Sequence, residues 1–208
     1  MKEGINGVSS VTPANIQFGA GTIHKGLTYT TSGSSGSWNF AASCVGATSG
    51  GSKLSIVPEV TKVEIDGANV ATKGLEVKTG ETATMQINFI ELNTSLIKAA
   101  TMGKDGTSED STNYDLVESK ASIETGDYWT NIAFVGVTTD GRKIIAILEN
   151  ALCTSGFEIE GKNKEAGIVS CTFECHADPS SDMDKLPWKI YYPKALTSGG
   201  SGGSGQTT

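Results

Sequence analysis

The sequence predicts a mainly β protein, built as a β-sandwich or barrel with one flanking α-helix. Several runs alternate between apolar and polar residues, which is the pattern of half-buried strands. Glycine supplies 26 of the 208 residues, which suits short strands joined by many turns. Only residues 93–103 carry a convincing helical pattern. Together these observations predict eight to ten strands and one helix.

The first part of the chain predicts an N-terminal arm that becomes the first strand, over residues 1–27. Residues 31–51 are rich in glycine and serine around an apolar island, Trp38-Asn39-Phe40. This composition predicts a long loop or an extended hairpin that lies on an apolar surface. The main β-sandwich domain is expected to cover residues 28–193, followed by a flexible Gly/Ser tail over 194–208.

Strands are expected on both sides of Asp66-Gly67, a favourable turn pair. Pro58 lies in the first of these strands and predicts an edge position or a bulge, because proline cannot donate to a sheet. The strand at 84–89 alternates cleanly. Its apolar face holds Met85, Ile87 and Phe89, and its polar face holds Thr84, Gln86 and Asn88.

The helix over 93–103 is expected to begin at a cap, Asn93 or Thr94, and to end with Gly103 beyond its last turn. Two hairpins should follow, at 131–152 and 156–178, and the run 144–148 is apolar on both faces. The strand near 169–176 alternates again. Its apolar face holds Val169, Cys171, Phe173 and Cys175, and its other face holds Ser170, Thr172, Glu174 and His176. A last short strand is bracketed by Pro187 and Pro193.

Charge argues against a protein that holds nucleic acid. The chain has 16 basic and 23 acidic residues, a net charge of −7, and no cluster of Lys and Arg. No apolar run is long enough to span a membrane, and the start "MKEGINGVSS" lacks the apolar stretch of a signal peptide. The four cysteines, Cys44, Cys153, Cys171 and Cys175, are therefore expected to stay reduced.

No motif predicts an enzyme or a cofactor. The most metal-like group is Cys171, Cys175 and His176, but strand periodicity places the histidine on the face opposite the cysteines. Gly19 and Gly21 lack the third glycine of a dinucleotide fingerprint. His24 has no partner set for nucleophilic catalysis in the sequence, so we expect no catalytic, cofactor-binding or metal site.

The order of segments resembles the tail tube proteins of long-tailed bacteriophages and related phage-tail-like particles. The resemblance covers most of residues 13–193 and lies in "PANIQFGAGTIHKGL", "KLSIVPEVTKVEIDG", "TATMQINFIEL", "YWTNIAFVGVTTDGRKIIAILENALC" and "PWKIYYP". It implies a sandwich with a flanking helix that assembles as hexameric rings stacked into a tube. Strands would line the lumen, and the tube would conduct double-stranded DNA.

The resemblance also implies partners and a location. Expected partners are other copies of the chain, a tail terminator, a tape measure protein, baseplate or tip proteins and, in a contractile tail, a sheath protein. DNA would pass without sequence-specific binding, and no membrane would be involved. The protein would belong to the virion tail, assembled in the cytoplasm of the bacterial host.

Candidate residues can be assigned on this basis. Small polar side chains suit a wall past which DNA must slide, and ring closure would bring about −42 formal charges from six copies at −7 each. The candidate lumen-facing residues are Thr84, Gln86, Asn88, Ser170, Thr172 and Glu174, with an ordinary solvated face as the alternative. The candidate inter-subunit residues are Ile16, Phe18, His24, Trp38, Phe40, Trp188 and Tyr191. Removal of residues 1–27 is expected to impair stacking and to leave the sandwich largely intact.

Other functions stay open. The same tube subunit could belong to a DNA-free particle, either bacteriocin-like or of a secretion type. An Ig-like module displayed on a surface would need an exposed groove with an aromatic rim. A hydrolase is the third interpretation, and it would depend on one of the two histidines.

Overall fold

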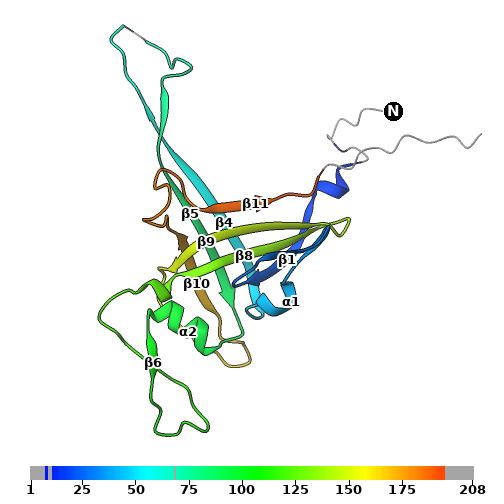
Figure 1. Cartoon of the computed structure of the whole chain (residues 1–208), viewed down its shortest axis with the longest axis vertical. Coiled ribbons are helices and arrows are strands. Elements are labelled where there is room, and N and C mark those ends of the chain that lie inside the picture. The colour runs from blue at the N-terminus through cyan, green and yellow to red at the C-terminus, as the bar shows by residue number, and fades with distance from the viewer. Residues whose placement is uncertain (1–7, 9–10, 68, 195–208) are drawn as a thin grey trace, which may run out of the picture.

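Antiparallel strands dominate the computed structural model of the chain, which describes residues 8, 11–67 and 69–194 (Figure 1). Strands make up 46% of the described residues and helical segments 10%, which confirms the prediction of a mainly β fold. The strands are β1 (Gln17–His24), β2 (Tyr29–Ser32), β3 (Ser35–Trp38), β4 (Thr48–Lys62), β5 (Glu76–Phe89), β6 (Lys104–Gly106), β7 (Leu116–Glu118), β8 (Trp129–Thr138), β9 (Lys143–Cys153), β10 (Val169–Cys175) and β11 (Trp188–Tyr191). The helical segments are η1 (Pro13–Asn15), α1 (Phe40–Ser43), α2 (Thr94–Thr101) and η2 (Thr125–Asp127).

Seven strands form one curled antiparallel sheet in the order β1-β8-β9-β10-β5-β4, with β11 pairing beside β9. The hairpins β2–β3 and β6–β7 stand apart from it. The curl brings the end of β1 against the segment that leads into β4. There the Val45 N–H donates to the Ile23 carbonyl (3.0 Å) and the Lys25 N–H donates to the Ser43 carbonyl (2.8 Å). We call this junction the seam.

The inner face of the curl is the main core. Both alternating strands, β5 and β10, turn their predicted apolar faces into it, where Met85, Ile87, Phe89, Val169, Cys171, Phe173 and Cys175 are buried. α2 closes this core with Leu96, Ala99 and Ala100. The period-2 pattern predicted these buried faces correctly, because each strand of a curled sheet has one inner and one outer side.

A smaller core lies on the other face of the β8–β9 hairpin. Its buried members are Leu27, Ala133, Val135, Ile145 and Ile147, and Trp38 and Phe40 pack against it. Leu148 belongs instead to the main core. Residues 144–148 of β9 are therefore covered on both sides, as their continuous apolar run predicts.

The predicted helix is α2. The Asn93 side chain accepts a hydrogen bond from the Leu96 N–H (2.9 Å), which caps the helix start. The left-handed residue at the other end is Met102, at φ 51°, one residue before the expected Gly103. The Gly103 N–H still reaches the Lys98 carbonyl (3.0 Å), so the last turn is satisfied.

Two expectations differ from the structure. Residues 31–51 do not form one long loop: they hold the β2–β3 turn, β3, α1 and the start of β4. The alternative of a hairpin on an apolar surface describes the first part of this segment, where the apolar island packs on the smaller core. The first strand lies within residues 1–27 as expected, but the described part of this segment is not separable from the sheet. β1 pairs along β8, and Ile23 and Leu27 are buried, so removal of this segment would open both cores. The N-terminal residues 1–7 and the predicted tail, apart from Lys194, lie outside the described residues.

β4 and β5 continue well past the rest of the sheet as a two-stranded ribbon, which forms the long projection at the top of Figure 1. We call residues 57–67 and 69–82 the arm. Pro58 lies on β4 at the sheet edge, and a bulge follows at Glu59 and Val60, as the proline predicts. In the part of the chain that the structure describes, no helix has the length and apolar character needed to cross a bilayer.

Candidate assembly surfaces

The six candidate lumen-facing residues lie together on the outer side of β5 and β10. The pairing register places Ser170 opposite Asn88, Thr172 opposite Gln86, and Glu174 opposite Thr84. The Gln86 side-chain amide donates to the Ser170 hydroxyl across the two strands (3.4 Å). We call this surface the polar face. Its residues are partly or fully exposed, while their neighbours in the chain are buried.

The side chains of the polar face are small to medium in size, and the face carries little charge. Glu174 is the only ionisable group among its six residues, and Lys53 on β4 extends the same face beside Gln86. Asn88 donates to the backbone carbonyl of Gly51 (3.3 Å), so β4 continues the polar surface sideways. A wall of this kind offers hydrogen-bonding groups but no cluster of cations that would hold a phosphate backbone.

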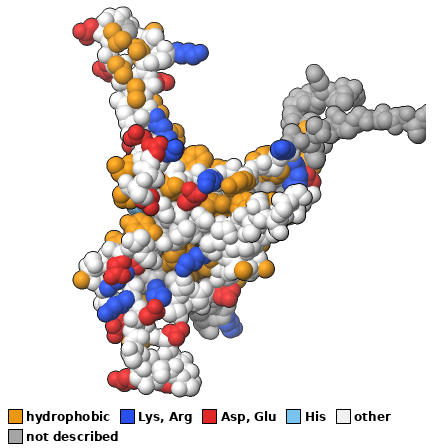
Figure 2. Space-filling view, viewed as in Figure 1, with side chains coloured by type: hydrophobic (Ala, Val, Ile, Leu, Met, Phe, Trp, Pro, Cys, Tyr) orange, Lys and Arg blue, Asp and Glu red, His pale blue; other side chains and the backbone are white. Residues whose placement is uncertain are grey.

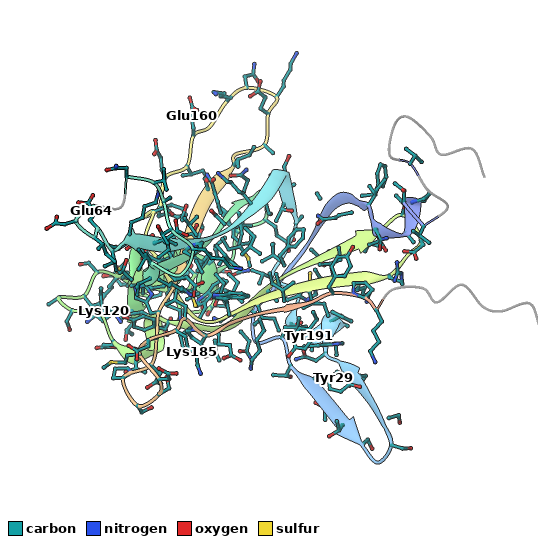
Figure 3. All side chains as sticks on the ribbon, turned by 90° about the horizontal axis from the view of Figure 1, so that it is seen from above. Tyr29, Glu64, Lys120, Glu160, Lys185 and Tyr191 are labelled. Atoms are coloured by element: carbon teal, nitrogen blue, oxygen red, sulfur yellow. The ribbon has the colours of Figure 1, made fainter. Side chains whose placement is uncertain are left out.

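Three of the predicted inter-subunit residues form an aromatic patch, although they are far apart in sequence. The ring of Trp38 lies 5.1 Å from that of Tyr191, 6.3 Å from Phe40 and 5.3 Å from Tyr29 (centroid distances). Tyr29 and Tyr191 are exposed, and Figure 3 shows Tyr29 on the β2–β3 hairpin, which projects from the body, with Tyr191 near the base of the hairpin. The patch thus covers the smaller core with one side and presents aromatic surface with the other.

Two further candidates lie near the start of β1: Ile16 just before the strand and Phe18 within it. Phe18 is 76% exposed and pairs with Val137 of β8, which is also exposed. Ile16 and Phe18 are therefore available for contact with another chain. Trp188 is less available, because it packs against the main core and its indole N–H donates to Glu81 (3.1 Å).

His24 is placed differently from the prediction. It is only 3% exposed, so within this fold it offers little surface to another chain. Its Nδ1 lies 2.9 Å from the Ser43 hydroxyl, and its Nε2 lies 2.9 Å from the Thr22 hydroxyl. Ser43 also donates to the Asn39 carbonyl (2.9 Å), which favours a neutral ring with the proton on Nδ1. His24 bridges to Cys44 at the seam, so its role is to join β1 to the segment that leads into β4.

The electrostatics of His24 follow from this placement. Burial lowers the pKa of His24, and the positive charge of Lys143 lowers it further. Both ring nitrogens are already engaged by hydroxyl groups of the same chain. The arrangement stabilises a neutral imidazole inside the seam and leaves no ring nitrogen facing solvent.

The cysteines of β10 behave as small apolar residues. Cys171 and Cys175 are buried in the main core, and burial raises the pKa of the Cys175 thiol to about 11. His176 points elsewhere, with Nδ1 2.9 Å from the Glu174 carbonyl and its ring edge-on to Tyr128. Among the described residues, no group of three or more His, Cys, Asp or Glu side chains is placed to hold a metal ion.

Comparison with known proteins gives no family for the chain: no family model matches it, and no curated protein matches it.

The arm is the surface that the sequence did not single out. Its valines and isoleucine are about half exposed or more: Val57, Val60, Val63, Ile65, Val70 and Val77. Figure 2 shows hydrophobic side chains gathered along this projection. β4 and β5 have 15 and 14 residues, well above the usual five or six, and this length was not evident from the sequence.

Proposed function

We propose that this chain is a non-enzymatic structural subunit of a bacteriophage tail tube, with the β-sandwich or barrel architecture of that family. Hexameric rings of the protein would stack into a tube that conducts double-stranded DNA into the host cell. The proposal includes the partners expected of such a subunit: the tail terminator, the tape measure protein, baseplate or tip proteins and, in a contractile tail, the sheath. It requires no cofactor and no metal.

The observation that carries the proposal is the uncovered apolar arm. A two-stranded ribbon is marginally stable in water on its own, and this one exposes six aliphatic side chains. Full burial of one such side chain is worth about 1.5–3 kcal/mol, so contact with a further surface is strongly favoured. Exposed strands with apolar side chains lead to aggregation unless a specific partner covers them. A repeating assembly of identical chains supplies that partner at every position.

The polar face supports the conduit part of the proposal. It lies on the outer side of the β5–β10 pair and combines small polar side chains with little charge. DNA slides most readily past a surface that lacks clustered cations, since each phosphate contact displaces counterions and adds affinity. With a chain net charge of −7, the assembled wall would not attract the duplex.

The test is electron microscopy of the purified full-length protein, together with an arm variant. In the variant, residues 60–78 are replaced by Asn-Gly, a short hairpin turn. We expect rings or stacked tubes from the unchanged protein. We expect a folded protein that does not assemble from the variant, because the main core does not depend on these residues.

A matched control shortens another exposed loop, residues 158–166, and should assemble normally. A protein that stays monomeric at high concentration would contradict the proposal. If that monomer bound a ligand through Tyr29, Trp38 and Tyr191, the result would support a surface-displayed binding module instead, since the aromatic patch is the feature that favours this second function.

A further inference from the structure

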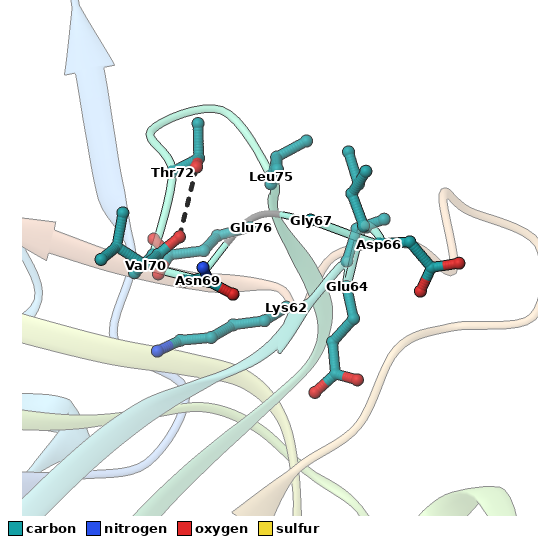
Figure 4. Close-up of a pocket in the computed structure, with 12 residues that line it drawn as sticks. Lys62, Glu64, Asp66, Gly67, Asn69, Val70, Thr72, Leu75 and Glu76 are labelled. Atoms are coloured by element: carbon teal, nitrogen blue, oxygen red, sulfur yellow. Dashed lines mark hydrogen bonds between the residues drawn. The ribbon is translucent and has the colours of Figure 1, made fainter.

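The tip of the arm combines apolar side chains with unpaired carboxylates. Val63, Ile65 and Val70 are 48%, 53% and 78% exposed. Glu64 and Asp66 alternate with the first two along the chain and point outward from the ribbon (Figure 4). Among the ion pairs of the described residues, none includes either carboxylate. The tip therefore suits a receiving surface that is apolar and carries a cation.

A surface of this description lies elsewhere on the same chain. A hollow of about 650 Å³ opens between β1, α1 and β8, and its apolar lining includes Phe40, Ala41, Val135 and Val137. Lys143 stands at its rim with the ammonium group 3.5 Å from the centre of the Phe40 ring. In the described part of the chain Lys143 makes no ion pair with a carboxylate. We call this surface the β8 hollow.

The arm cannot fill the β8 hollow of its own chain. Its tip stands at one end of the molecule, and α1, which borders the hollow, lies at the far side of the body (Figure 1). A donor surface and a receptor surface at different places on one chain give a head-to-tail contact, which repeats from copy to copy. Such a contact is what stacking requires.

We propose that the arm tip of one copy docks in the β8 hollow of a second copy, with Glu64 and Asp66 facing Lys143. The aliphatic side chains of the tip become buried against Phe40 and the valines of β8. The carboxylates supply the counter-charge that Lys143 lacks within its own chain. This inference rests on the proposed function, because it names the contact through which successive copies would be joined.

Another hollow, beside α2, is a weaker receptor. It is lined by Lys25, Lys98, Lys104 and Lys120, but three of these lysines already pair with carboxylates of the same chain. The fourth, Lys25, donates to Ser95 (2.8 Å) and lies over the Trp129 ring (4.4 Å). This hollow offers polar groups that are already satisfied and little apolar surface for the valines of the arm.

A native thiol makes the docking directly testable. Cys44 is exposed and lines the β8 hollow, whereas the other three cysteines are buried. The variant Ile65→Cys places a second exposed thiol at the arm tip. A short bismaleimide added to the assembled variant should yield a ladder of covalent oligomers on a denaturing gel. The same variant in a Cys44→Ser background should show none of the ladder.

A second experiment tests the proposed ion pairing of Glu64 and Asp66 with Lys143. Lys143→Glu should raise the critical concentration for assembly about tenfold or more, because like charges then meet at the contact. The pair of changes Glu64→Lys and Asp66→Lys should do the same, and all three changes together should restore assembly. Lys53→Glu, an exposed lysine on the polar face, is the matched control and should assemble normally. Circular dichroism confirms that each variant is folded.

Two results would overturn the docking: a ladder that persists without Cys44, or single charge reversals that leave assembly unchanged. Failure of the docking and failure of the proposed function are distinguishable. Tubes of the Ile65→Cys variant that give no Cys44-dependent ladder would reject the docking alone. A Cys44-dependent ladder from a protein that forms no tubes would keep the docking and reject the tube.

Discussion

At the scale of single residues, His24 shows how context decides the role of a reactive side chain. The ring lies between two hydroxyl groups, edge-on to Phe40 at a centroid distance of 5.7 Å, and inside the junction of the curled sheet. Thr22 and Ser43 satisfy both nitrogens of the neutral ring, and burial together with the charge of Lys143 disfavours its protonation. The ring is thus a structural connector whose stability depends on its protonation state.

This placement predicts a pH dependence of folding. The pKa of His24 is lowered in the folded chain, so the unfolded chain takes up the proton first as pH falls below about 6.5. The free energy of unfolding should therefore decrease with falling pH, by at most about 1.4 kcal/mol per pH unit from this group. The loss begins below the unfolded pKa and stops below the folded one. Urea unfolding between about pH 8 and about pH 5 measures it.

The variant His24→Gln isolates the contribution of this ring, because carboxylates elsewhere titrate in both proteins. The difference in unfolding free energy between the unchanged protein and the variant should shrink as the pH falls. Lys143→Gln removes one of the two causes of the lowered pKa and should weaken the dependence. Parallel curves for the unchanged protein and His24→Gln would show that the ring does not titrate as proposed.

At the scale of elements, successive residues of β10 alternate between a face buried in the main core and a face exposed to solvent. Phe173 is fully buried and packs on Trp129 with ring centroids 4.8 Å apart. Phe173→Ala should lower the free energy of unfolding by about 3–5 kcal/mol through lost burial and a residual cavity. Thr172→Ala should change it by no more than ~0.5 kcal/mol, because the Thr172 side chain lies on the polar face.

Chemical denaturation of the two variants provides the measurement. A large loss in Thr172→Ala would mean that the polar face is covered within the protomer and is not free to form a wall. Assembly of Thr172→Ala, in contrast, should be close to normal. The pair of variants therefore tests the orientation of β10 independently of any partner.

The same elements show which features of the fold could be predicted from the sequence alone. Alternation predicted both faces of β5 and β10, because a side-chain period of two is a local property of a strand. The capped helix was predictable for the same reason. The seam was not, since it depends on the Ile23 and Val45 backbones meeting after the sheet has curled. The aromatic patch depends likewise on tertiary structure, because Trp38 and Tyr191 are separated by most of the chain.

At the scale of the whole molecule, two kinds of surface have different functions. The arm, the aromatic patch and the β8 hollow expose apolar groups that favour contact between chains. The polar face exposes small polar groups that favour contact with water. A tube wall needs both kinds in separate places, because subunits must bind one another firmly while the passing duplex must not be bound at all.

Lysine substitutions on the polar face test this separation. In tubes built from the double variant Gln86→Lys and Thr172→Lys, adjacent paired strands would present cations toward the proposed lumen. Short labelled duplexes should then be retained by the tubes at about 50 mM salt and released at about 200 mM, as expected when phosphates displace counterions. Tubes of the unchanged protein should retain almost none.

The position of the retained DNA decides whether the polar face lines a lumen. Duplex held inside a tube should be protected from a nuclease, which is too large to enter with it. The control Asn163→Lys adds a cation to the exposed loop between β9 and β10, and any DNA that it retains should be digested. Retention by the polar-face variant without protection would place that face on the outside of the assembly. The assignment of Thr84, Gln86, Asn88, Ser170, Thr172 and Glu174 to a DNA conduit would then be wrong, even if the arm and the β8 hollow still joined the chains.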